Sequence, residues 1–70
     1  MKEFTFKTRY DLGEKVVGFD STNNKLIEFE INRISFDLSL TDILIWYHGD
    51  SVMFREQDVY STRQDFIDNL

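Results

Sequence analysis

The sequence predicts a mainly β fold, a small and partly open antiparallel barrel with a short C-terminal helix. Three observations carry this prediction. Apolar and polar residues alternate with period two through most of the 70 residues. Clusters of turn-forming residues at 20–24 and 48–50 separate the alternating segments. After Ser61 the apolar residues change to helical spacing.

The stretch from Leu26 to Leu38 organises the chain. Ile27, Phe29 and Ile31 alternate with polar residues, and a second alternating set begins at Ile34. The step of three from Ile31 to Ile34 moves the apolar side chains out of phase, which a strand absorbs only with a bulge or bend. We therefore expect one long strand over 25–38 that bends near residues 32–33 and turns a corner of the barrel.

The remaining strands follow the same alternation. Phe4 and Phe6 alternate with polar neighbours, and Val16 with Val17 and Phe19 gives the next strand two apolar sides. The expected strands lie at about 2–8, 14–19, 42–47 and 51–55, with 56–60 as an edge strand or its beginning. These segments form two hairpins, one closed by the turn at 20–24 and one by His48-Gly49-Asp50.

The final segment is predicted as a helix over about 62–69. Ser61 or Thr62 can cap it, since Gln64 or Asp65 follows three residues later. Phe66, Ile67 and Leu70 then share one face. A helix this short is not stable alone, so it is expected to dock over an open end of the sheet.

Size and composition bound the class of protein. Seventy residues predict a single domain, and the absence of cysteine excludes disulfides and thiolate metal sites. The net charge of −5 disfavours sequence-independent binding of nucleic acid. No signal peptide is expected, and the strongest apolar run, 43–47, is too short to span a bilayer, so a soluble cytoplasmic protein is expected.

Two segments resemble a known group of proteins. They are Tyr-Asp-Leu-Gly-Glu-Lys-Val at 10–16 and Phe-Arg-Glu-Gln-Asp-Val-Tyr-Ser-Thr-Arg-Gln-Asp-Phe-Ile at 54–67. This outline resembles small SH3-like barrel proteins of phages and mobile elements of gut bacteria. The resemblance implies an SH3-like fold and a bacterial host cell as the setting, but no activity. The aromatic residues of the proline-binding groove in eukaryotic SH3 domains cannot be placed on this chain.

No group of residues points to catalysis or to a metal. His48, Asp50, Glu56 and Asp58 are near in sequence, but one imidazole with carboxylates is a thin set of ligands, and a solvated turn is the simpler interpretation. Glu28 and Glu30 share a strand face about 7 Å apart, as solvated carboxylates ordinarily do. No nucleophile-elbow motif is present. We therefore expect a protein that is not an enzyme and uses no cofactor, metal or small-molecule substrate.

Trp46 is the most informative single residue. The segment 43–47 is apolar on both faces, with Leu44 and Trp46 opposite the face expected in the core. One interpretation is that the C-terminal helix covers Leu44 and Trp46 through Phe66 and Leu70. The other is that they anchor a partner or a second copy of the chain, with Tyr10 and Leu12 extending the patch.

The charge distribution suggests further alternatives. The acidic C-terminal part, including Asp50, Glu56 and Asp58, is either a solvated surface or a surface that meets a basic protein, such as the nucleic-acid groove of a host enzyme. We expect a protein-binding module that modulates a host protein, for example a defence factor. The alternatives are a structural homo-oligomer and a nucleic-acid-binding barrel with an N-terminal basic patch. The residues of that patch would be Lys2, Lys7, Arg9, Lys15 and Lys25.

Overall fold

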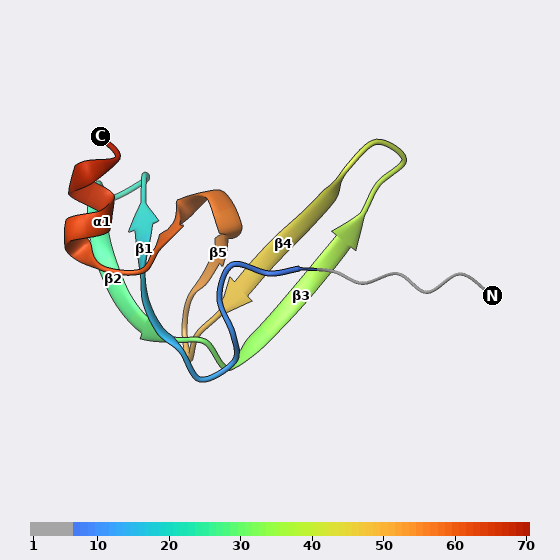
Figure 1. Cartoon of the computed structure of the whole chain (residues 1–70), viewed down its shortest axis with the longest axis horizontal. Coiled ribbons are helices and arrows are strands. Elements are labelled where there is room, and N and C mark those ends of the chain that lie inside the picture. The colour runs from blue at the N-terminus through green and yellow to red at the C-terminus, as the bar shows by residue number, and fades with distance from the viewer. Residues whose placement is uncertain (1–6) are drawn as a thin grey trace.

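The computed structural model, which describes residues 7–70, shows a mainly β fold with one short helix (Figure 1). The elements are β1 (Lys15–Asp20), β2 (Lys25–Glu30), β3 (Arg33–Leu38), β4 (Ile43–His48), β5 (Met53–Arg55), the 3₁₀ helix η1 (Glu56–Asp58), β6 (Val59–Tyr60) and α1 (Arg63–Asp68). The predicted fold class is confirmed. The predicted strand over 2–8 falls mostly outside the described residues, and Lys7 and Thr8 are not in a strand.

The strands form two antiparallel sheets of three strands each. One has the order β2-β1-β6 and is here called the β1 sheet; the other has the order β3-β4-β5 and is called the β4 sheet. The two sheets do not join into a closed barrel among the described residues. The predicted edge strand at 56–60 is reduced to β6 after the turn of η1.

The predicted long strand over 25–38 is in fact two strands that belong to different sheets. Ile31 and Asn32 separate β2 from β3, at the point where the apolar alternation slips. Ile31 donates its amide to the Glu14 carbonyl at 3.0 Å, while the Asn32 amide bonds to the His48 carbonyl at 2.8 Å. Adjacent residues thus pair with different sheets, and the bend becomes a full change of sheet.

The turns form as their residues predict. Asp20 accepts hydrogen bonds at Oδ1 from the amides of Thr22 and Asn23, and Asn24 has a φ of 54°. Short polar side chains stabilise a turn in this way, and asparagine tolerates the left-handed region. The hairpin of β1 and β2 therefore has an uninterrupted register from Lys15 opposite Glu30 to Asp20 opposite Lys25.

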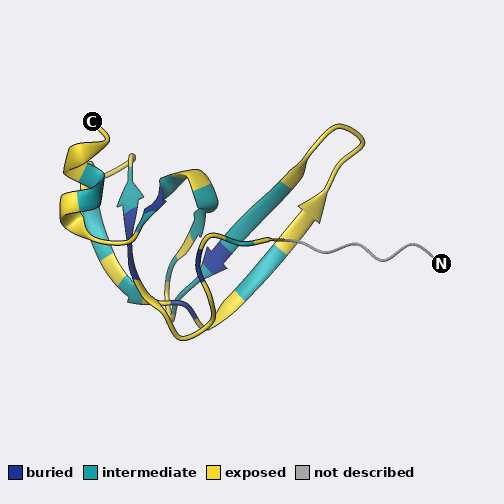
Figure 2. Ribbon diagram, in the orientation of Figure 1, coloured by how far each residue is buried: buried dark blue, intermediate teal, exposed yellow. Residues whose placement is uncertain are grey.

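The core lies where the two sheets face each other. Its buried residues are Tyr10, Val16, Ile31, Tyr47 and Val59. Phe29, Ile34, Ile45 and Phe54 pack around them. Figure 2 shows this buried region near the junction of the sheets, whereas the far end of the β3–β4 hairpin is exposed.

The helix α1 covers the outer face of the β1 sheet. Phe66 lies 5.0 Å from Phe19 and 5.1 Å from Tyr60, measured between ring centroids. Val17 shares this face by register and is only 4% exposed. Of the two predicted caps, Thr62 is the N-cap, because its hydroxyl oxygen accepts the Asp65 amide at 3.0 Å. The helix is six residues long, slightly shorter than predicted.

Candidate functional site

Leu44 and Trp46 lie on the outer face of the β4 sheet. Trp46 is opposite Ser35 on β3 and Arg55 on β5, whereas the buried Tyr47 points to the other face. Side chains of directly paired residues share a face, so Ser35 and Arg55 flank the indole. Leu44 and Trp46 are both half-buried in this position. They form an apolar strip with polar neighbours.

The C-terminal helix does not dock on this strip in the way that one interpretation of the sequence required. Phe66 packs on Phe19 and Tyr60, both in the β1 sheet. Leu70 is 88% exposed. Figure 1 shows α1 beside β1 and β2, at the opposite end of the molecule from the β3–β4 hairpin. The expected cover over Trp46 is therefore wrong.

Tyr10 does not extend the strip, because it is a core residue. Its exposed fraction is 9%, its hydroxyl donates to the Val59 carbonyl at 3.3 Å, and its ring meets Tyr47 edge-on. Burial raises the pKa of the Tyr10 phenol above its usual value. Leu12, two residues later, is 65% exposed in the loop before β1. Of this predicted pair, only Leu12 is available at the surface.

The three acidic candidates have separate roles in the structure. Asp50 is exposed and accepts a hydrogen bond from the Asn32 side chain at 3.1 Å. Glu56 is half-buried and accepts from the Tyr47 hydroxyl at 2.5 Å. Asp58 is half-buried in η1. No group of three metal-ligating side chains occurs within residues 7–70.

Tyr47 and Glu56 belong to a buried hydrogen-bond network. The Tyr47 oxygen also accepts from the amides of Arg9 and Tyr10, at 3.1 and 3.3 Å. Burial, followed by the hydrogen bond to Glu56, raises the pKa of Tyr47 to about 12. This network fixes the segment before β1 against β4, so Glu56 has a structural role in the fold.

His48 and Ser35 form a polar pair on the outer face of the β4 sheet. The Ser35 hydroxyl lies 2.7 Å from Nε2 of His48. Burial, and then the nearby Arg33 charge, lower the pKa of His48. A serine nucleophile needs a base that a third group orients, but among residues 7–70 no carboxylate bonds to this ring. The pair therefore lacks the third, orienting group of a catalytic triad.

The basic candidates do not gather into one patch. Lys15 and Lys25 lie at opposite ends of the β1–β2 hairpin, about 17 Å apart along the strands. Each is opposite an acidic residue, Glu30 and Asp20 respectively. Lys7 and Arg9 are exposed before β1, and Lys2 lies outside the described residues.

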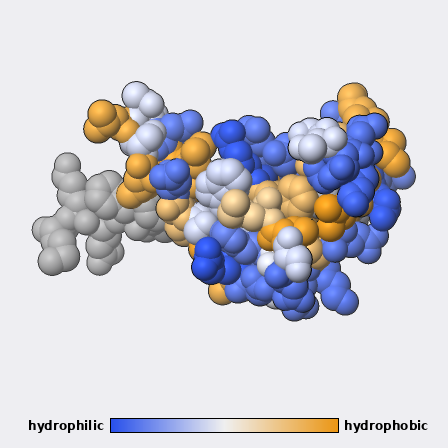
Figure 3. Space-filling view, turned by 180° about the vertical axis from the view of Figure 1, so that it is seen from behind, coloured by the Kyte–Doolittle hydropathy of each residue, from blue (hydrophilic) through white to orange (hydrophobic). Residues whose placement is uncertain are grey.

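The far end of the β3–β4 hairpin is an apolar surface that sequence reasoning missed. Leu38 is 65% exposed, Leu40 is 105% exposed and Ile43 is 45% exposed. The hairpin projects away from the core in Figure 1, and hydrophobic residues gather at its tip in Figure 3. The alternation in β3 did indicate a buried face, but it carried no signal of where along the strand the core ends.

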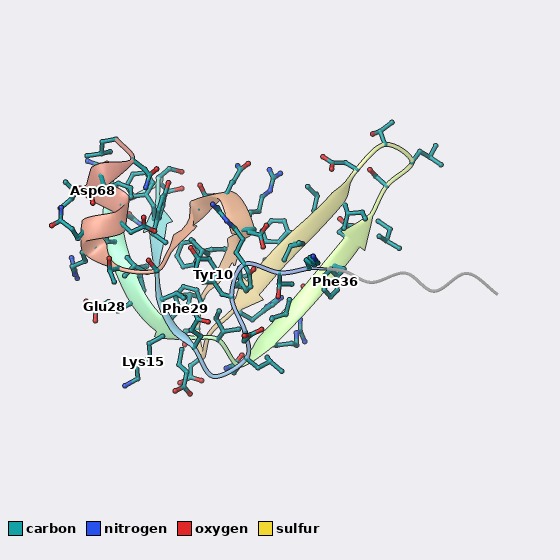
Figure 4. All side chains as sticks on the ribbon, in the orientation of Figure 1. Tyr10, Lys15, Glu28, Phe29, Phe36 and Asp68 are labelled. Carbon is teal, nitrogen blue, oxygen red and sulfur yellow. The ribbon has the colours of Figure 1, made fainter. Side chains whose placement is uncertain are left out.

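A groove lies on the outer face of the β1 sheet. Its volume is about 710 Å³, and Arg63 crosses it with Nε 2.9 Å from Oε1 of Glu28. Figure 4 labels three of the lining residues, Lys15, Glu28 and Phe29. The full lining is Lys15, Val16, Val17, Glu28, Phe29, Glu30, Ser61, Thr62, Arg63 and Gln64. The predicted shared face of Glu28 and Glu30 thus forms one wall of this groove.

A smaller pocket of about 230 Å³ lies against the same part of β2. It is bounded by β2 from Ile27 to Glu30, by Asn32, and by the turn from Asp50 to Val52. Glu28, Phe29 and Glu30 line both hollows. Residues 28–30 therefore lie between the groove and the smaller pocket.

No helix among the described residues has the length and apolar character needed to cross a membrane. Comparisons of the chain with protein-family models, curated proteins and solved structures find no match. The function must therefore be argued from the residues and their geometry.

Proposed function

We propose that this protein is a non-enzymatic module that binds another protein by direct contact through the β3–β4 hairpin. The observation that carries this proposal is the exposure of Leu38, Leu40 and Ile43 together at one projecting end. Exposed apolar groups that cluster on a small domain are typical of protein-binding surfaces. Phe36, which is 41% exposed and opposite Ile45, shares the face of Leu38 and Ile43, whereas Leu44 and Trp46 lie on the opposite face of the hairpin.

The free energy gained by burying these side chains indicates how much of this surface a stable complex needs. Burying an exposed leucine or isoleucine contributes about 1.5 to 3 kcal/mol. Because Leu38 and Ile43 are already partly covered, the three residues together contribute about 3 to 6 kcal/mol, which only reaches the low end of the cost of association. The hairpin end alone would bind weakly, so we expect the partner to enclose the hairpin and also to contact Leu44 and Trp46 on its other face, with Trp46 as the aromatic anchor.

The resemblance to phage and mobile-element proteins supports a host protein as the partner, and a defence factor is one such protein. The net charge of −5 favours a partner with a basic surface around the apolar contact. In this proposal the exposed acidic residues steer the encounter, and the hairpin supplies the affinity.

The test compares matched leucine variants in a pull-down. Tagged wild type, Leu40→Ser and Leu70→Ser are each incubated with lysate of a bacterial host, with and without nuclease treatment. Both leucines are highly exposed, so both variants are expected to fold. The proposal expects a stoichiometric protein that binds wild type and Leu70→Ser but is lost with Leu40→Ser.

Other outcomes would contradict the proposal. Binding that disappears with nuclease and weakens steeply with salt would indicate nucleic acid. Self-association in sedimentation experiments without any other partner would indicate a structural homo-oligomer. Equal binding by Leu40→Ser and wild type would exclude the hairpin end as the contact.

A further inference from the structure

The edge of the β1 sheet at β2 is unpaired within residues 7–70. We propose that this edge binds an extended, basic segment of a partner protein, which adds to the sheet as a further strand. The proposal concerns a different surface from the hairpin, and it is tested separately.

The first step of the argument is the hydrogen bonding of β2. In the order β2-β1-β6, β2 pairs with β1 on one side, and no strand within residues 7–70 pairs with its other side. The Ile31 amide donates to the Glu14 carbonyl, and the Ile31 carbonyl accepts from the Gly13 amide. Both main-chain groups of Ile31 therefore face the β1 side. Main-chain groups alternate along a strand. Ile27 and Phe29 therefore face β1, whereas Leu26, Glu28 and Glu30 turn their amides and carbonyls outward.

The second step is that the edge is long and regular. The register of β2 against β1 runs without interruption over six residues. Proteins commonly protect an edge with a proline, a bulge, a very short strand or charged side chains. β2 has only the charged side chains, Lys25, Glu28 and Glu30, which restrict pairing to a segment of matching charge. The other edge of the same sheet, β6, has only two residues. β2 is therefore the edge of this sheet that can accept another strand.

The third step is the pair of recesses beside the edge. Side chains of an added strand point alternately to the two faces of the sheet. On one face they meet the groove of about 710 Å³, and on the other the pocket of about 230 Å³. Because residues 28–30 line both, successive side chains of one extended segment have space on both sides.

The charged residues beside the β2 edge indicate which kind of segment would bind there. Glu28 and Glu30 point to the groove side, about 7 Å apart. Glu28 is paired with Arg63 there and Lys15 lies opposite Glu30, but Glu30 has no hydrogen bond or ion pair among the described residues. Asp50 adds a carboxylate beside the smaller pocket. A strand with lysines at alternate positions would place each lysine beside a glutamate, a favourable cross-strand pair. The smaller pocket offers Ile27, Phe29 and Val52 to an apolar residue between them.

The same charges argue against a second copy of this chain. In an antiparallel pairing of β2 with β2 centred on Glu28, each Glu28 would face its own counterpart. Like charges directly opposite each other destabilise a strand pair. This register of self-association is therefore disfavoured, and the glutamates favour a basic segment.

The experiment is an NMR titration with three synthetic peptides. The probe is acetyl-Ser-Lys-Val-Lys-Val-Lys-Ser-amide. One control replaces each lysine with glutamate, and the other methylates alternate main-chain amides of the probe, so that it keeps the charge but cannot pair as a strand. We expect only the probe to shift the amide signals of Leu26, Glu28 and Glu30 and to slow their hydrogen exchange several-fold. The inward amides of Ile27 and Phe29 should keep their exchange rates.

Matched variants test the charge. Glu30→Gln should weaken probe binding about two- to fivefold, whereas Asp37→Asn, which removes an exposed carboxylate from β3, should not. Leu40→Ser should bind the probe as wild type does, so a failure of the hairpin proposal is separable from a failure here. No shift with the probe, or equal shifts with the methylated peptide, would overturn the inference.

Discussion

The Tyr47 hydroxyl donates a hydrogen bond to the Glu56 carboxylate at 2.5 Å. The same oxygen accepts the amides of Arg9 and Tyr10. One fully buried phenol thus connects β4, η1 and the segment that leads to β1. A domain of 70 residues has a small net stability. Tyr47 should therefore contribute a large share of its free energy of unfolding.

Replacing Tyr47 with phenylalanine should lower the free energy of unfolding by about 2 kcal/mol. The change leaves the ring in the core but removes the hydrogen bond to Glu56 and the acceptor of the Tyr10 amide, whereas the Arg9 amide keeps Oε2 of Glu56 as an acceptor at 3.1 Å. Urea denaturation followed by Trp46 fluorescence would measure this. Tyr60→Phe is the matched control, since no hydrogen bond involves its hydroxyl within residues 7–70. An equal loss in both variants would contradict the role of the network.

The raised pKa of Tyr47 gives stability a specific pH dependence. The folded value is about 12, against 10.0 for the ordinary phenol, because burial and then the Glu56 hydrogen bond favour the protonated form. Between these values the unfolded chain loses the proton while the folded chain keeps it, so stability should fall as pH rises from about 10 to about 12. Thermal unfolding at a series of alkaline pH values would show this. The fall should be smaller in Tyr47→Phe, and an identical fall would contradict the assignment.

The sequence predicted local structure well where one segment alone decides it. The alternation of apolar residues shifts by one position between Ile31 and Ile34. A regular strand with one buried face cannot accommodate this shift, so it located the break between β2 and β3. The Asx turn at Asp20 and the cap at Thr62 depend on residues three positions apart. These features need no knowledge of the rest of the chain.

Features that depend on distant pairing could not be predicted in this way. The short strand β6 pairs with β1, which carries the end of the chain to Phe19 and away from Trp46. Tyr10 was expected to extend a surface patch, but the Val59 carbonyl, 49 positions later, satisfies its hydroxyl in the core. The exposed end of the β3–β4 hairpin follows from how far the partner sheet extends, which the alternation in β3 does not encode.

Gly18 should be intolerant of a side chain. A Cβ atom built on it would lie 2.4 Å from the ring of Phe54, which packs on the core. Gly18→Ala should therefore lower stability by about 1 to 3 kcal/mol through overpacking. A double-mutant cycle with Phe54→Leu gives the control, since a smaller side chain at 54 should recover part of the loss. Additive losses in urea denaturation would show that the contact is not the cause.

Phe66 should hold α1 on the β1 sheet. The helix has six residues, too few to be stable alone, and its aromatic contacts are Phe19 and Tyr60. Phe66→Ala should lower stability by about 2 kcal/mol, because the side chain is half-buried, and should speed amide exchange throughout α1. Ile67→Ala, at a site that is 53% exposed, is the control and should cost well under half as much. Hydrogen exchange followed by NMR separates the outcomes: loss of protection in α1 with β4 unchanged supports the docking role. Retained protection in α1 would mean that the cap at Thr62 and other contacts hold the helix without Phe66.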